Sequence, residues 1–185
     1  MSETVTFSVE KHVARLTLNN PEKHNALGRK ELDALRSAVA EVAASDSARV
    51  LVLSGKGDKT FCAGASLQEL NAGEIRVDDY QDMTDAIASL AIPTVCAISG
   101  NVFGGGVELA LSCDFRIGIE GTRMRVPAAS IGLCYPVRGI ERFVQRLGPG
   151  VAKRILVAAE TLNADEMLRI GFLDHLVMPA QLEQT

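Results

Sequence analysis

Strand-length apolar runs alternate along this chain with segments of helical periodicity, and this order limits the fold more than any other feature. The run Arg49–Ser54 is almost continuously apolar, as in a strand that is covered on both faces. Before it, Leu32, Leu35, Val39 and Val42 recur at helical spacing. Strands that alternate with helices indicate an α/β fold with a largely parallel sheet.

The remaining elements follow from the same patterns, and neither an internal repeat nor a linker interrupts them. We therefore expect one domain over residues 1–185. The expected elements are a hairpin of Val5–Val9 and Val13–Leu18, helices at 29–44, after Ser66 and from Asp78 to Leu90, strands at 49–54, 94–99 and 115–119, a glycine-rich turn at 100–106, a short helix at 107–111, and mostly helix from Gly139 onward, with Asn163 and Glu166 as a cap pair.

Composition excludes several classes of function. A net charge of -4 and only 4% aromatic residues argue against nucleic-acid partners, which need basic patches and stacking surfaces. No apolar run reaches 18 residues, so we expect no membrane association. The start Met1–Thr4 lacks the basic and apolar regions of a secretory signal. We therefore expect a cytoplasmic protein.

The four cysteines and three histidines form no ligand pattern. Cys62, Cys96, Cys113 and Cys134 include no C-x-x-C pair, and the histidines are scattered. We expect no metal site and reduced, mostly buried thiols.

Two turns rich in small residues each follow a strand and lead into a helix. The first is Phe61–Ser66, and the second contains Gly104-Gly105-Gly106. Helix N-termini present unpaired N–H groups, and small residues let a substrate approach them. Side by side, two such turns could direct two N–H groups at one oxygen and form an oxyanion hole. The alternative is that both are simply tight turns.

Glu108 is the most informative single residue, because it lies in the apolar stretch Val107–Leu111. A carboxylate there either reaches water at a helix end or is buried with a raised pKa. In the second case it is suited to move protons near neutral pH. A base beside an oxyanion hole is what proton abstraction next to a carbonyl requires.

Three sequence blocks resemble the crotonase family, also called the enoyl-CoA hydratase/isomerase family. They are Leu16–Leu27 (LTLNNPEKHNAL), Phe61–Ser66 (FCAGAS) and Ser99–Ala110 (SGNVFGGGVELA), the last followed by Asp114. The resemblance implies a crotonase-like spiral of β-β-α units with a helical C-terminal part, acyl-CoA thioester substrates, no cofactor beyond the CoA of the substrate, and homotrimers or homohexamers.

The resemblance also implies roles for individual residues. The N–H groups of Ala65 and Gly105 would hold the thioester oxygen, and Glu108 would act as the acid/base. The residues implied in CoA binding are Lys23, His24, Ala26, Ala63, Gly64 and Leu67.

Departures from the family pattern leave the reaction open. The hydratases carry a second glutamate where this chain has Ala128, and the following turn reads Cys134–Gly139. Glu141 could replace that carboxylate, but we interpret it as a solvated helix residue. The chain also stops at Thr185, so we expect the family's final helical segment to be absent.

Hydration, double-bond isomerisation and other enolate reactions such as decarboxylation are therefore alternative predictions for the reaction. The alternative from another class is a weakly active or inactive CoA-thioester binder that serves as a structural subunit. A serine peptidase on a related spiral fold is disfavoured, since Ser99 and Ser130 have no evident histidine partner.

Overall fold

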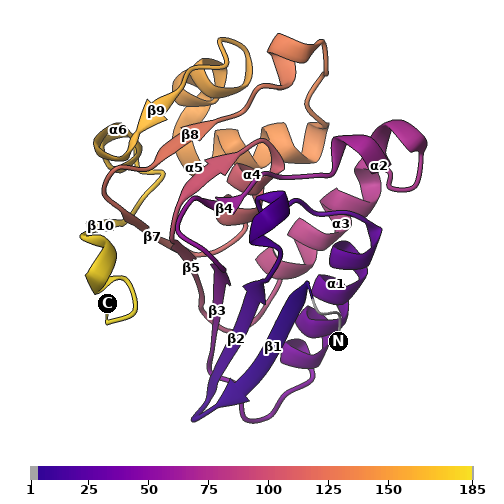
Figure 1. The fold of residues 1–185 in the computed structure, drawn as a ribbon, viewed down its shortest axis with the longest axis vertical. Coiled ribbons are helices and arrows are strands. Elements are labelled where there is room, and N and C mark those ends of the chain that lie inside the picture. The colour runs from indigo at the N-terminus through magenta and orange to yellow at the C-terminus, as the bar shows by residue number, and fades with distance from the viewer. Residues whose placement is uncertain (1–3, 185) are drawn as a thin grey trace.

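The computed structural model describes residues 4–184, and its strands form two sheets (Figure 1). The larger sheet has the order β1-β2-β3-β5-β7-β10 and the smaller one β4-β6-β8-β9. The strands are β1 Val5–Glu10, β2 Val13–Leu18, β3 Val50–Gly55, β4 Thr60–Cys62, β5 Thr94–Ile98, β6 Asn101–Phe103, β7 Phe115–Ile119, β8 Arg123–Arg125, β9 Leu162–Asn163 and β10 His175–Val177.

Helices connect these strands. They are α1 Arg29–Ala43, α2 Leu67–Ala72, α3 Val77–Ala88, α4 Gly105–Leu111, α5 Val137–Leu156 and α6 Ala164–Arg169, with 3₁₀ turns at Pro21–Lys23, Ala128–Ile131 and Pro179–Gln181. Gly148 kinks α5 just before Pro149. Between residues 4 and 184, no helix is both long and apolar enough to cross a membrane.

Successive pairs of strands are divided between the two sheets. In each of the pairs β3-β4, β5-β6 and β7-β8, the first strand enters the larger sheet and the second enters the smaller sheet. Neighbours β3, β5 and β7 are parallel, as are β4, β6 and β8. A helical segment follows each pair. The chain is therefore the expected spiral of β-β-α units.

The core lies between the larger sheet and the helices that cover it. Leu51 and Leu53 of β3 and Cys96 and Ile98 of β5 are fully buried. Helix α1 buries the stripe predicted from its spacing, including Leu32 and Leu35. In Figure 1, α1 lies against the indigo strands β1 and β2, and α3 lies beside α1. Helix α5 packs against α4.

The longer predicted elements are confirmed, whereas the short strands were not predicted. The hairpin, the helices α1 and α4 and the strands β3, β5 and β7 lie where expected. The expectation of a plain turn over 100–106 is wrong, because Asn101–Phe103 pairs with β4 and β8. The C-terminal part is mostly helical, as expected, but it also contains the short strands β9 and β10, which were not predicted.

Two predicted helix caps also differ from the structure. Asp79, rather than Asp78 with Gln81, closes the start of α3 by accepting a hydrogen bond from the Arg76 N–H at 2.8 Å. The Ser66 side chain accepts from the Glu69 N–H, as expected. The Glu69 carboxylate, however, accepts from the Arg29 N–H and links α2 to α1. The Asn163–Glu166 capping box is formed in both directions.

Candidate active site

The two turns identified in the sequence lie against each other. They follow β4 and β6, which are parallel neighbours, so both turns emerge at the same edge of the smaller sheet. A Cβ on Gly64 would lie 2.5 Å from the backbone nitrogen of Gly105. Gly64 also has φ +87°, which favours glycine. This close approach excludes any side chain at position 64.

The backbone N–H groups of Ala65 and Gly105 have no hydrogen-bond partner among residues 4–184. Leu27 pairs with Ala65 in a parallel bridge, in which Leu27 donates to Gly64 O and accepts from Ser66 N. Because successive N–H groups of extended backbone point to opposite sides, the Ala65 N–H points away from Leu27. Gly105 is the first residue of α4, where an N–H has no acceptor within the helix.

Glu108 lies one turn into α4 and is 1% exposed. Its Oε1 accepts hydrogen bonds from Gln81 Nε2 at 2.8 Å and from Thr84 Oγ1 at 3.3 Å. Its Oε2 accepts from the Tyr135 hydroxyl at 2.8 Å. The Arg142 Nε lies 3.8 Å from Oε1. Two side chains of α3 and one residue before α5 therefore fix the carboxylate.

Burial raises the pKa of Glu108 above its usual range, because the interior disfavours the charged form. Hydrogen bonds from Tyr135 and Gln81, the charge of Arg142 and the Thr84 hydroxyl oppose this shift. A carboxyl group with a raised pKa exchanges protons more readily near neutral pH than an ordinary glutamate does. The buried alternative considered for Glu108 is therefore the one observed.

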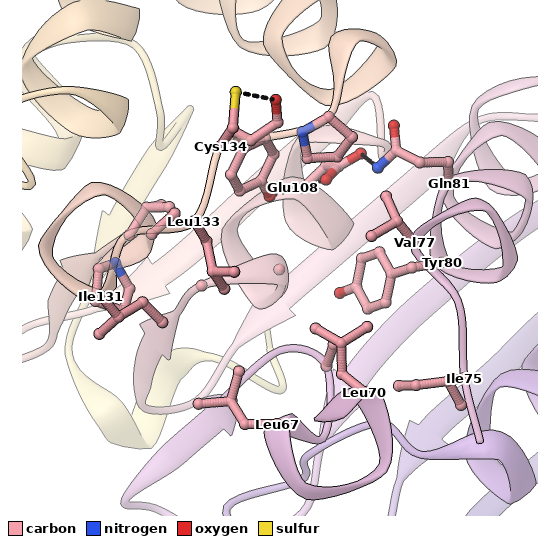
Figure 2. Close-up of a pocket in the computed structure, with 18 of the residues that line it drawn as sticks. Leu67, Leu70, Ile75, Val77, Tyr80, Gln81, Glu108, Ile131, Leu133 and Cys134 are labelled. Carbon is pink, nitrogen blue, oxygen red and sulfur yellow. Dashed lines mark hydrogen bonds between the residues drawn. The ribbon is translucent and has the colours of Figure 1, made fainter. Parts of the chain in front are cut away.

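An apolar cavity of about 190 Å³ connects the turns with Glu108. Figure 2 shows Leu67, Leu70, Ile75 and Val77 on one side of it and Ile131 and Leu133 on the other. Ala63, Ala65, Gly104, Gly105 and Glu108 also line it, and so does Ala128. Among the lining residues that the structure describes, Glu108 is the only carboxylate.

The residues expected to bind CoA lie together beside this cavity. The segment Lys23–Leu27 runs along the first turn, where Ala63 N donates to His24 O and Leu27 N donates to Gly64 O. Asn25 fixes the segment, since its amide donates to the carbonyls of Lys56, Thr60 and Phe61. Ala63 and Leu67 line the cavity, whereas Lys23 and His24 are exposed next to it.

Sequence reasoning missed the residues that hold Glu108. Gln81 was assigned to a helix cap, and Thr84, Tyr135 and Arg142 were not singled out at all. Gly139 is the one feature in the sequence that could have indicated this packing. A Cβ at this position would lie 2.5 Å from Tyr135 Cε1 and 3.0 Å from Glu108 Oε2. Glu141 is exposed on α5 and is absent from the cavity wall, as its interpretation as a solvated residue predicted.

Comparison with known proteins places this geometry in a family. The model of the enoyl-CoA hydratase/isomerase family matches residues 8–185. The chain belongs to the enoyl-CoA hydratase/isomerase family. It is 35% identical to a crotonyl-CoA hydratase of Syntrophomonas wolfei, with 97% of this chain and 71% of the relative covered. It is 32% identical to a short-chain-enoyl-CoA hydratase of Clostridium acetobutylicum, with 98% and 71% covered.

Comparison with solved structures supports the same family assignment. A crystal structure of enoyl-CoA hydratase from Bacillus anthracis superposes with a TM-score of 0.91 at 28% identity, covering 98% of this chain and 72% of that one. Family membership and the α/β crotonase fold, both expected from the three sequence blocks, are thus confirmed. The chain spans about 71% of the length of the curated relatives named above.

Proposed function

We propose that this family member isomerises the double bond of enoyl-CoA thioesters, with Glu108 as its single acid/base. The observation behind this choice is that Glu108 is the only carboxylate among the described lining residues, which also include Ala128. Moving one proton between two carbons needs one base, whereas the hydratases of the family use two carboxylates. Gly105 and Ala65 would bind the thioester oxygen.

The chemistry follows from the geometry. Two unpaired N–H groups at one end of the cavity stabilise the negative charge that develops on the thioester oxygen. Glu108 then removes a proton from the α-carbon of a 3-enoyl thioester, and the electron pair moves into the conjugated enolate. Delivery of the same proton to the γ-carbon gives the 2-enoyl thioester. The carboxylate is regenerated, so no other reactant is consumed.

The apolar wall of the cavity favours a substrate whose acyl chain carries no polar substituent. Leu67, Leu70, Ile75 and Leu133 offer no hydrogen-bonding groups to the ligand, and burying alkyl carbons against them is favourable. The CoA portion would leave the cavity along Lys23, His24 and Ala26, beside Ala63 and Gly64. The charge of Lys23 and the ring of His24, both at the surface, are suited to a phosphorylated group.

Hydration of 2-enoyl-CoA is the second candidate, and the comparisons favour it. The relatives from Syntrophomonas wolfei and Clostridium acetobutylicum are both named hydratases. In that reaction Glu108 would activate a water molecule and return its proton to the α-carbon.

One spectroscopic assay separates the two reactions. Isomerisation of trans-3-hexenoyl-CoA creates the absorbance of the conjugated enoyl thioester, whereas hydration of crotonyl-CoA removes it. We expect absorbance to rise with the first substrate. Glu108→Gln should lower the rate by about 10²–10⁴-fold, the usual contribution of a general acid/base. Glu141→Gln, which changes an exposed carboxylate of the neighbouring α5, is the matched control and should retain full activity.

The other outcomes have definite meanings. Faster loss of absorbance with crotonyl-CoA would replace isomerisation by hydration. Binding of both thioesters without turnover would support the non-catalytic CoA-thioester binder. The homotrimer implied by the resemblance stays a prediction, which a native mass of about three times 19.7 kDa would bear out.

A further inference from the structure

Tyr80 places a polar group inside the cavity that the reaction described above does not use. The residue is 6% exposed, and α3 directs its ring into the cavity wall. Figure 2 shows its hydroxyl pointing into the cavity near Leu70. Among residues 4–184 this hydroxyl has no hydrogen-bond partner. An unpaired buried hydroxyl destabilises a fold, so its presence in a cavity requires an explanation.

The hydroxyl lies at the end of the cavity where the two turns meet. A Cβ on Gly105 would be 2.7 Å from both Cζ and the hydroxyl oxygen of Tyr80. The phenol therefore packs directly on the Cα of Gly105, whose own N–H is unpaired. Tyr80 thus adds a side-chain donor to the two backbone donors at this end.

The other buried polar atoms of the region do not offer Tyr80 a partner. The hydrogen bonds to the Glu108 oxygens come from Gln81, Thr84 and Tyr135. Gln81 Oε1 is an unpaired acceptor and Arg142 Nε an unpaired donor, but neither is hydrogen-bonded to Tyr80. A ligand in the cavity can supply the acceptor that Tyr80 lacks.

The ligand group that fits is an oxygen without a proton of its own. Burial raises the pKa of Tyr80 well above its usual range, so the phenol remains a neutral donor. Three donors at one end of an apolar cavity suit a carbonyl oxygen that gains negative charge. The rest of the cavity wall suits the alkyl part of the ligand.

We propose that the Tyr80 hydroxyl donates a hydrogen bond to the thioester oxygen of the substrate, as a third donor beside the N–H groups of Ala65 and Gly105. This inference rests on the proposed function, because it needs an acyl-CoA thioester in the cavity. It makes Tyr80 a catalytic residue for whichever enolate reaction the protein performs.

The test compares two ligands that differ only in the carbonyl oxygen. Butyryl-CoA is a thioester, and S-butyl-CoA is the corresponding thioether. Calorimetric titration of Tyr80→Phe should show binding of butyryl-CoA weakened by about three- to tenfold, as expected for one lost hydrogen bond. Binding of S-butyl-CoA should be unchanged. Turnover should fall by about a hundredfold, since the enolate oxygen is more charged than the ground-state carbonyl.

Tyr135→Phe is a matched comparison for stability. Both tyrosines line the same cavity, but only the Tyr135 hydroxyl has a partner, Glu108. Without ligand, Tyr80→Phe should raise the urea midpoint of unfolding, because it removes an unpaired buried hydroxyl. Tyr135→Phe should lower it. These opposite signs show whether the Tyr80 hydroxyl is unpaired in solution.

The remaining results overturn the inference in distinguishable ways. If Tyr80→Phe binds both ligands and turns over as the wild type does, Tyr80 is not a donor to the substrate, while the proposed function stands. If the variant loses affinity equally for thioester and thioether, Tyr80 only shapes the cavity. If the wild type binds neither ligand, the proposed function and the inference both fail.

Discussion

At the scale of single residues, the buried surroundings of Glu108 disfavour the charged form of its carboxyl group. Burial raises the pKa of Glu108, and the hydrogen bonds from Tyr135, Gln81 and Thr84, together with the charge of Arg142, compensate only in part. The folded protein therefore binds a proton at Glu108 more tightly than the unfolded chain does. The contribution of Glu108 to stability is therefore greatest below the ordinary pKa of 4.5 and is lost as pH rises through the raised pKa of the folded state.

Glu108→Gln should consequently be more stable than the wild type at neutral pH. The amide carries no charge to desolvate, and both Tyr135 and Gln81 can reorient to accept from it as well as donate. Urea unfolding from pH 4 to pH 8 should show the advantage of the variant growing with pH and vanishing at the acidic end. Parallel stability curves for the two proteins would contradict a raised pKa at this position.

The site residues that could be predicted are those that belong to local patterns. Ala65 and Gly105 lie in small-residue turns before helices, and Glu108 is a charge in an apolar stretch, so each is visible in a few neighbouring letters. Gln81 and Tyr135 each contact Glu108 from 27 residues away. Neither residue type is unusual in its own segment, so only the packing of α3 and α5 against α4 reveals their role.

At the scale of elements, the smaller sheet determines where the turns meet. Its strands β4, β6 and β8 have three residues each. Three residues are too few to establish an alternating pattern, which is why none of these strands was predicted. The longer β3 and β5 were predicted because each contains four consecutive apolar residues.

The contact between the turns can be tested with two glycines that both have a positive φ. Gly64 has φ +87° and Gly148 has φ +79°, but a Cβ would meet the Gly105 nitrogen at position 64 and nothing within 4 Å at position 148. Gly148 combines this φ with ψ 160°, so Gly148→Ala should cost about 2 kcal/mol from backbone strain alone and retain activity. Gly64→Ala should cost about 3 kcal/mol or more and abolish turnover. Equal losses of stability in thermal unfolding would refute close packing of the turns.

At the scale of the whole molecule, Arg116 and Asp174 connect β7 to β10, the strand at the edge of the larger sheet. Asp174 accepts hydrogen bonds at 2.8 Å from both the backbone N–H and Nη2 of Arg116. Arg116 is buried, and its guanidinium also donates to the carbonyls of Phe172 and Cys113. The pair thereby fixes the start of β10 beside β7.

Asp174→Ala should destabilise the protein by about 2 kcal/mol, less than a fully buried pair would because the Asp174 side chain is 34% exposed. The matched control is Glu160→Ala, which breaks the exposed pair with Arg154 and should cost at most about 0.5 kcal/mol. Chemical unfolding measures both values. Hydrogen exchange should also accelerate in β10 for the first variant, and unchanged exchange there would show that the pair does not secure the strand.

The four cysteines differ in solvent exposure, so their reactivity can report local opening of the structure. Cys134 is exposed and lies in the cavity wall, whereas Cys62, Cys96 and Cys113 are buried. Burial raises the pKa of Cys62 to about 12, and its Sγ both donates to Asn25 O and accepts from Gly64 N, beneath the first turn. A thiol reagent should therefore label Cys134 at once and Cys62 only when that turn opens. A bound thioester would shield Cys134 from the reagent, so labelling rates followed by mass spectrometry would report ligand occupancy and local opening of the turn separately, without any change to the sequence.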